Sequence, residues 1–379
     1  GQTELTLEFV EHDRQRIDWG QIRYMEFRKD NRELCPLLPK SKRHPRVYVN
    51  ANGLAGLRKR WLPDARFQAI VEKLKFGDMG FGVETAGDVD TACLVYLLTK
   101  DKEIGEKVKT KIVDLCRMPT WSGRPDSLLM GGDNDRGVGY LLYYLGVAWE
   151  LLGDFFNAKE RRLVLAKAEE YLRKMYDFTV LQRAYMGHPT TEPHSLGAWN
   201  GVGVACMAFY DELAIARKAL PFFHGLFRDS LNLFPPGGKM AWATFFPFHL
   251  VRYLAAAHTF GGKPACRGGA GRLPEMDKSS FLDNLGKALL MCFETPNTQE
   301  LQRGLRTREH RYLTSFLCRF HPTDGIESIY QAFVEREKKT AGDVALGLFD
   351  FLYAPTKRVK PAAFPRFPLF AKEIGDIIF

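Results

Sequence analysis

The sequence predicts a mainly α-helical protein of successive antiparallel helical hairpins, with short β segments near both ends of the chain. Apolar residues recur at helical spacing over about three hundred residues from His44 onward. Short breaks containing Gly, Pro or Asp separate the amphipathic segments, as at Gly153-Asp154 and 235–238. Residues 3–10 instead alternate apolar and polar side chains as a strand does.

The predicted helices follow one another closely, which favours a ring of hairpins in which inner and outer helices alternate. Asn52 is the expected N-cap of the first helix, Asp88 of the third and Asp343 of the last. No short sequence repeat is visible, which argues against short-unit helical solenoids. We expect helices at 53–62, 64–76, 89–100, 103–117, 136–153, 157–176, 195–216, 217–233, 241–260, 279–294, 307–319, 325–338 and 344–353.

The pattern divides the chain into three parts. Residues 1–43 form an N-terminal extension with a strand, and 44–354 form the helical domain. Residues 355–379 begin as a proline-spaced linker and end in a strand at 373–379. A lone strand is not stable without partners. It either pairs with the N-terminal strand or begins a β domain outside this chain, and we favour the second.

The composition is that of a globular protein, with 45% hydrophobic and 26% charged residues. The formal net charge of +9 suits an acidic partner, either nucleic acid or an anionic polysaccharide. Basic residues form no stripe with interleaved aromatics, so we do not expect nucleic acid. No run of roughly 18 apolar residues occurs, so no membrane span is expected.

The seven cysteines are scattered, without CxxC or clustered Cys/His spacing. This pattern argues against a zinc site and against a disulfide framework. Cys93, Cys206 and Cys292 lie in apolar helical stretches, where we expect them to fill core space.

The most informative stretch is 192–212, which is typical of a helix start followed by tight packing. Pro193 suits the first helical turn, where its missing N–H costs nothing. His194, Trp199 and Asn200 have little reason to lie on such a helix unless its N-terminal end faces a site. Because helix N-termini attract anions, His194 is a candidate for contact with an acidic ligand. The small residues that would allow close packing are Gly197, Ala198, Gly201, Gly203, Ala205 and Ala208.

Several motifs follow one another along the chain: His44-Pro-Arg-Val within 44–58, Asp133-Asn-Asp-Arg leading to Val147-Ala-Trp-Glu, the His194 helix, Phe234-Pro-Pro-Gly-Gly with Trp242, Arg252-Tyr-Leu and 370–379. In their order they resemble motifs of the heparinase II/III-like polysaccharide lyases. In that family an (α/α) toroid precedes an antiparallel β-sandwich. The resemblance covers roughly 44–379 and implies an incomplete (α/α) toroid whose β-sandwich lies outside this chain.

The resemblance implies β-elimination on a uronate-containing anionic polysaccharide, of glycosaminoglycan or alginate type. The reaction removes the C5 proton beside a carboxylate and expels the 4-linked sugar oxygen. It therefore needs a group that neutralises the carboxylate, a base and an acid. We expect His194 to bind the carboxylate or act as base. His249 and Tyr253, four residues apart on one helix face, are the expected acid/base pair.

Further residues are candidates for sugar binding. The arginines could hold acidic groups through bidentate contacts, and the tryptophans could stack on pyranose rings. Each also has an ordinary structural interpretation: a helix cap, a core side chain, an internal ion pair or a solvated loop residue. The candidates are Asn200, Trp199, Trp242, Arg252, Arg136, His188 and Glu192.

Two departures from the family pattern bear on activity. Pro193 stands where the family usually has Asn, and Phe246 and Phe248 occupy both positions that match its active tyrosine. Phenylalanine cannot carry a proton, so the tyrosine role falls to another residue or is lost. A uronyl C5-epimerase of the same fold is one alternative. A non-catalytic carbohydrate-binding toroid is another, and the phenylalanine pair favours it.

The resemblance places the family's further histidine and metal ligands in the β-sandwich. We therefore expect no cofactor or metal in this chain, and any divalent zinc, manganese or calcium ion would belong to that domain. The expected partners are the polysaccharide and a β-sandwich from the rest of the polypeptide or from a second chain. Polysaccharide degradation implies a periplasmic or secreted protein.

Overall fold

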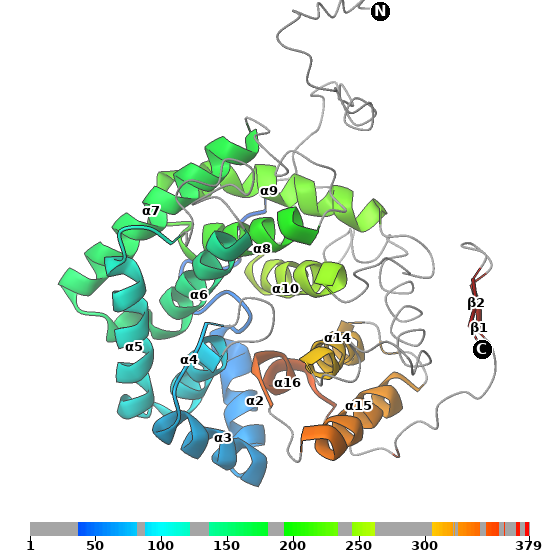
Figure 1. Ribbon diagram of the computed structural model, residues 1–379. Coiled ribbons are helices and arrows are strands. Elements are labelled where there is room, and N and C mark those ends of the chain that lie inside the picture. The colour runs from blue at the N-terminus through cyan, green and yellow to red at the C-terminus, as the bar shows by residue number, and fades with distance from the viewer. Residues whose placement is uncertain are drawn as a thin grey trace, which may run out of the picture. The chain divides into compact units, whose positions relative to one another are not determined.

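The computed structural model describes residues 37–81, 88–121, 136–180, 193–233, 245–261, 305–320, 322, 325–341, 346–355, 360, 369–371 and 376–378. The chain divides into two units, Gly1–Glu33 and Leu34–Phe379, and every described residue belongs to the second. The described part is mostly helical, which confirms the predicted class (Figure 1). The strand expected at 3–10 and the helix expected at 279–294 lie outside the described residues.

The helices of the described part agree closely with those expected from periodicity. They are α2 (Ala51–Trp61), α3 (Ala65–Phe76), α4 (Asp88–Thr99), α5 (Lys102–Arg117), α6 (Arg136–Leu152), the 3-10 helix η2 (Gly153–Phe155), α7 (Ala158–Val180), α8 (Pro193–Ala208), α9 (Ala214–Leu233), α10 (Phe245–Phe260), α14 (Leu305–Phe320), α15 (Ile326–Ala341) and α16 (Leu348–Tyr353).

Side-chain caps determine where several helices begin. The side chains of Asn50, Asp64 and Asp101 accept hydrogen bonds from backbone N–H groups in the first turns of α2, α3 and α5. Asn52 lies inside α2, so the predicted cap is wrong. Asn50 takes that role because its backbone is extended and its side chain faces the free N–H groups.

The other two predicted caps have different outcomes. Asp88 is the first residue of α4, and Asp343 lies outside the described residues. The last helix, α16, starts after Gly347, whose N–H donates to the Asp350 carboxylate at 3.0 Å. Asp350 therefore caps this helix from within its first turn.

The predicted boundary between helices 195–216 and 217–233 is wrong. The first helix, α8, ends at Ala208, and α9 begins at Ala214. The Arg46 guanidinium holds the turn between them, donating to the Ala208 carbonyl at 3.3 Å and to the Asp211 carboxylate. The turn contains no Gly or Pro. A distant side chain therefore helps to hold the turn, together with Arg217 of α9, whose Nη1 donates to the carbonyls of Tyr210 and Asp211 at 3.0 Å.

Among the described helices, the most extensive packing contact joins α6 and α8. A Cβ atom on Gly139 would overlap Ala198, and one on Gly201 would overlap the Gly139 carbonyl. Two turns further along α6, Gly146 lies against Ala205. Because the contacts advance together along both helices, α6 and α8 run parallel, with their N-terminal ends on the same side.

Contacts between neighbouring helices form a closed succession (Figure 1). The first series runs from α4 to α6, α8, α10, α14 and α16, and α16 contacts α4 again. The intervening helices pack beside this series: α5 against α4 and α6, α7 against α5 and α9, α9 against α8, and α15 against α14. The series therefore joins every second helix of the sequence from α4 to α10, and the helices between them pack beside it.

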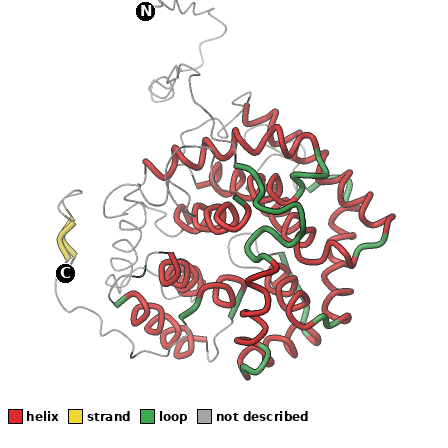
Figure 2. Tube along the Cα trace, turned by 180° about the vertical axis from the view of Figure 1, so that it is seen from behind, coloured by secondary structure: helices red, strands yellow, loops and turns green. Residues whose placement is uncertain are grey.

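A long loop, residues 37–50, joins distant parts of this succession and is seen among the green segments of Figure 2. Lys40 N–H donates to the Phe260 carbonyl at 2.8 Å at the end of α10. The Tyr48 hydroxyl donates to the Arg252 carbonyl at 3.1 Å in the middle of the same helix. The loop thereby attaches the start of the described chain to α10.

Near the C-terminus, β1 (Leu369–Ala371) pairs antiparallel with β2 (Asp376–Ile378). Leu369 lies opposite Ile378, and Ala371 lies opposite Asp376. The strand expected at 373–379 corresponds to β2, but the partner found for it is neither of the two expected, because β2 pairs with β1 a few residues earlier in the chain. Most of the predicted linker, 355–368, lies outside the described residues.

Side chains that the sequence places in apolar helical stretches are buried in the structure. Cys93 and Cys206 are fully buried in the core, as predicted, and Cys292 lies outside the described residues. Among the described helices, none combines the length and the apolar character that crossing a membrane requires.

Candidate functional site

Several predicted site residues cannot be placed by their side chains. Trp242, His188 and Glu192 lie outside the described residues. Four others lie in the first turns of described helices, but their side chains are outside the described part: Arg136 on α6, His194 on α8, and Phe246 and Phe248 on α10.

The described candidates lie toward the N-terminal halves of three adjacent helices, α6, α8 and α10. The Tyr253 ring of α10 packs directly against Gly203 of α8. One turn earlier on α10, His249 meets Tyr140 of α6, and the neighbouring Gly139 abuts Gly201. The three helices therefore bring their polar residues together within about two turns of one another along their axes.

Tyr140 and His249 form a buried hydrogen-bonded pair. The Tyr140 hydroxyl lies 3.1 Å from His249 Nε2, and the two side chains are 1% and 0% exposed. His249 was a sequence candidate, but Tyr140 was not. The only sequence signal was its place at the end of the segment that begins at Asp133.

Tyr253 has a different partner. Its hydroxyl lies 2.8 Å from His224 Nδ1 on α9, and its ring stacks on Phe227 with centroids 3.8 Å apart. The predicted pair of His249 and Tyr253 is thus divided between two histidine–tyrosine pairs. Sequence reasoning missed His224, because nothing in its own amphipathic helix distinguishes it.

Asn200 is the most unusual polar residue of the cluster. It is fully buried, and among the described residues neither its amide oxygen nor its amide nitrogen has a hydrogen-bond partner. The adjacent Trp199 Nε1 is buried and lacks a partner in the same described part. Each such group costs about 1–3 kcal/mol when left unpaired. Buried polar groups are nearly always paired, so these atoms are exceptions within the described residues.

Asn200 and Trp199 share one side of α8. They precede Gly203 by three and four residues, and residues at these spacings lie on the same helix face. The α10 ring of Tyr253 packs on that glycine. The unpaired donors and acceptor therefore belong to the side of α8 that faces α10.

Arg252, a predicted sugar ligand, is only 1% exposed. Its Nη2 lies 3.8 Å from Asp90 Oδ2, and its guanidinium lies over the Tyr143 ring at 4.4 Å. Tyr143 also donates to Asp90 at 3.1 Å. Burial raises the pKa of Asp90, although Arg252 and the hydrogen bonds act to lower it. In this structure Arg252 belongs to an internal network that joins α4, α6 and α10.

The His44-Pro-Arg motif forms a second charged cluster. His44 lies 3.0 Å from the Glu150 carboxylate and 3.2 Å from that of Glu212. Arg46 N–H donates to Glu150 at 2.7 Å, and its guanidinium binds Asp211. Burial opposes a charge on His44, but the two carboxylates outweigh it and raise the pKa to about 9.

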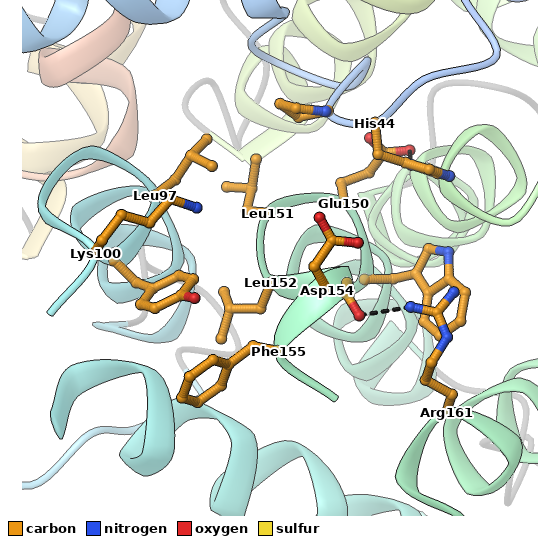
Figure 3. A pocket seen from close by; sticks show the side chains of 13 residues that line it. His44, Leu97, Lys100, Glu150, Leu151, Leu152, Asp154, Phe155 and Arg161 are labelled. Atoms are coloured by element: carbon orange, nitrogen blue, oxygen red, sulfur yellow. Dashed lines mark hydrogen bonds and ion pairs between the residues drawn. The ribbon is translucent and has the colours of Figure 1, made fainter. Parts of the chain in front are cut away.

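A pocket adjoins this second cluster (Figure 3). Its lining includes His44, Glu150 and Asp154, with Lys100 and Arg161 on opposite sides. It lies at the C-terminal end of α6, about ten residues, or about 15 Å, along the helix from the Tyr140 level. Its volume is about 80 Å³. The pocket is therefore separate from the polar cluster of α6, α8 and α10.

Within the described ranges, no group of three or more His, Cys, Asp or Glu side chains is arranged to hold a metal ion. In comparisons with known proteins, no protein-family model and no curated protein matches this chain. The function must therefore be inferred from the residues and their geometry.

Proposed function

We propose that this chain is the toroid part of a heparinase II/III-like polysaccharide lyase. It would cleave a uronate-containing anionic polysaccharide, of glycosaminoglycan or alginate type, by β-elimination. It would act in the periplasm or outside the cell, together with a β-sandwich from the same polypeptide or from a second chain. That domain, rather than the helices, would hold any divalent metal.

The arrangement of helices supports this proposal. An (α/α) toroid has a ring of inner helices, each followed by an outer helix. The closed succession of α4, α6, α8, α10, α14 and α16, with other helices packed beside it, is what such a ring requires. The parallel course of α6 and α8 also fits, because inner helices of such a ring point the same way.

The observation that carries the proposal is the unpaired side chain of Asn200. Its amide can donate two hydrogen bonds and accept others, and the neighbouring Trp199 can donate one more. All of these groups are buried and, within the described residues, unpaired. A sugar carboxylate or hydroxyl group would satisfy them. Donors in a water-poor site would also stabilise the charge that develops when C5 loses its proton.

The proposed reaction assigns a part to each group. The Asn200 amide donates hydrogen bonds to the uronate carboxylate and so stabilises its negative charge. His194, on the first turn of the same helix, accepts the C5 proton. The electrons of that C–H bond form the C4–C5 double bond, and the bond from C4 to the glycosidic oxygen breaks. The leaving oxygen then takes a proton from an acid on the opposite side of the site.

The direct test uses the complete protein and a panel of hyaluronan, chondroitin, heparan sulfate and alginate. β-Elimination creates an unsaturated uronate that absorbs in the ultraviolet. We expect absorbance to rise with at least one polymer and His194→Ala to abolish the rise. A flat trace with every polymer would contradict the lyase proposal.

Two alternatives predict different results. The phenylalanines at 246 and 248 favour a non-catalytic carbohydrate-binding toroid, which would bind a uronate oligosaccharide without changing it. A uronyl C5-epimerase would incorporate solvent deuterium at C5 without cleaving the chain. Calorimetry combined with mass spectrometry of the recovered sugar separates the two.

A further inference from the structure

We propose that Tyr140 is the phenol that protonates the leaving sugar oxygen, and that His249 returns the proton to it. This inference rests on the proposed lyase function. It assigns the acid role, for which the sequence pattern supplies only phenylalanines at 246 and 248.

The first argument is the contact itself. A phenol can deliver a proton and recover it quickly only if a titratable partner lies within hydrogen-bond distance. The Tyr140 hydroxyl lies 3.1 Å from His249 Nε2. Imidazole exchanges protons near neutral pH more readily than any other side chain. The two residues therefore form a relay that crosses from α6 to α10.

The second argument is position. Gly139 abuts Ala198 and Gly201 on α8, so Tyr140 lies at the level of Asn200. The unpaired amide of Asn200 is the group expected to hold the carboxylate. An acid at the same level can reach the oxygen on C4, which is adjacent to the carboxylate-bearing carbon C5.

The third argument concerns the competing phenol, Tyr253. It lies one turn further along α10, where its ring is confined between Gly203 and Phe227. Its hydroxyl is bonded to His224 at 2.8 Å. A stacked ring in contact with backbone cannot turn toward a substrate without disrupting the α8–α10 interface. The geometry therefore favours Tyr140.

These residues and water account for every proton that the reaction transfers. Tyr140 gives its phenolic proton to the leaving oxygen as the C4–O bond breaks, which leaves a phenolate. Protonated His249 then gives a proton to the phenolate. The base on α8 releases the C5 proton to water, and water reprotonates His249. No other reactant is needed.

Burial adds a requirement. Tyr140 and His249 are 1% and 0% exposed, so the site must open when the polymer binds. Once the sugar is in place, exclusion of water would strengthen the interaction between the acid and the leaving oxygen.

The test compares Tyr140→Phe with Tyr143→Phe in the complete protein. Both changes remove a buried hydroxyl from α6, but the Tyr143 hydroxyl bonds Asp90. We expect Tyr140→Phe to lower kcat about 10²–10⁴-fold, with binding of a uronate oligosaccharide unchanged. Tyr143→Phe should keep the wild-type kcat. Equal kcat for Tyr140→Phe and wild type, or loss in Tyr253→Phe alone, would overturn the inference.

A second variant keeps the test independent of folding effects. His249→Gln retains a hydrogen-bonding group but cannot relay a proton. It should lower kcat, and the double variant with Tyr140→Phe should be no slower than the slower single variant, because the pair acts as one unit. Losses that multiply would show separate roles and contradict the relay.

Failure of the proposed function has a different signature. A wild-type protein that exchanges the C5 hydrogen with solvent deuterium without cleaving the polymer would refute the lyase. The acid assignment would fall with it, because no leaving group is then protonated. A wild-type protein that cleaves while Tyr140→Phe cleaves equally fast refutes only the assignment to Tyr140.

Discussion

At the scale of single residues, the structure separates polar groups that are satisfied from those that are not. His249 and Tyr253 each have a hydrogen-bonded partner from a neighbouring helix. Asn200, in contrast, is buried among the described residues without one. Stability alone would favour an apolar side chain there, and this is the reason for proposing that the asparagine binds the substrate.

Asn200→Leu tests this explanation. Leucine has the same branched shape without polar atoms, so the free energy of unfolding should rise by about 1–3 kcal/mol. Urea denaturation would measure the rise, and polymer cleavage should be lost. Asn157 is the matched control because its side chain accepts from the N–H groups of Lys159 and Glu160. Asn157→Leu should lower stability by about 1 kcal/mol with cleavage retained. A less stable Asn200→Leu protein would indicate that the amide is satisfied.

His44 predicts how stability depends on pH. Its pKa is raised from 6.5 to about 9 by Glu150 and Glu212. A raised folded-state pKa means that the ion pairs contribute fully below pH 6.5 and that their contribution disappears as the pH rises through about 9. The stability difference between wild type and His44→Asn should therefore shrink over this interval. Thermal unfolding at several pH values measures it, and a constant difference would refute the ion pairs.

At the scale of elements, the local sequence pattern determines where most of the described helices lie along the chain. How closely two helices pack depends on single glycines. The interface of α6 and α8 brings backbone against backbone at Gly139 and Gly201. No larger residue fits at either position. This contact places Tyr140 of α6 at the same level along the helix axes as Asn200 of α8.

Two substitutions in α6 test the role of close packing. Gly139→Ala should lower the free energy of unfolding by about 1–3 kcal/mol or more, because the new methyl group would overlap the backbone at Ala198. Gly137→Ala meets no atom within 4 Å, so it should be neutral or stabilise the helix by up to about 1 kcal/mol. Chemical denaturation of both variants makes the comparison. Equal changes in the free energy of unfolding would mean that helix propensity, rather than close packing, determines the effect of an alanine in α6.

At the scale of the whole molecule, the helix succession closes between early and late segments of the chain. Trp61 Nε1 of α2 donates to the Phe351 carbonyl of α16 at 2.7 Å. Leu348 N–H donates to Thr91 of α4 at 3.2 Å. Arg60 also reaches the carbonyl of Ala354 at 2.7 Å. Each of these hydrogen bonds joins residues more than 250 positions apart in sequence. We call this junction between the early helices α2 and α4 and the late segment around α16 the seam.

Trp61→Ala should open this seam. Loss of a fully buried tryptophan should cost about 3–5 kcal/mol, and hydrogen exchange should accelerate in α2 and α16. Exchange in α7, which does not take part in the seam, should change least. Unchanged protection of α16 would show that the succession closes without this contact.

Local pattern was sufficient for most helices of the described part and for the burial of Cys93 and Cys206. It failed where the local structure depends on contacts with residues elsewhere in the chain. The turn after α8 is held partly by Arg46, from a distant part of the chain, and β2 pairs with a nearby strand that periodicity did not indicate. Tyr140 was missed for the same reason, because its partner lies 109 residues away.

The sequence alone therefore determined the helical class, the order of the helices and the candidate histidines, since these depend on side-chain periodicity and on residue type. Only the tertiary structure decided which groups meet. It paired Tyr140 with His249 and His224 with Tyr253, and it left Asn200 buried and unpaired within the described residues. Hydrogen bonds act over about 3 Å, and only the packing of helices brings residues a hundred positions apart within that distance.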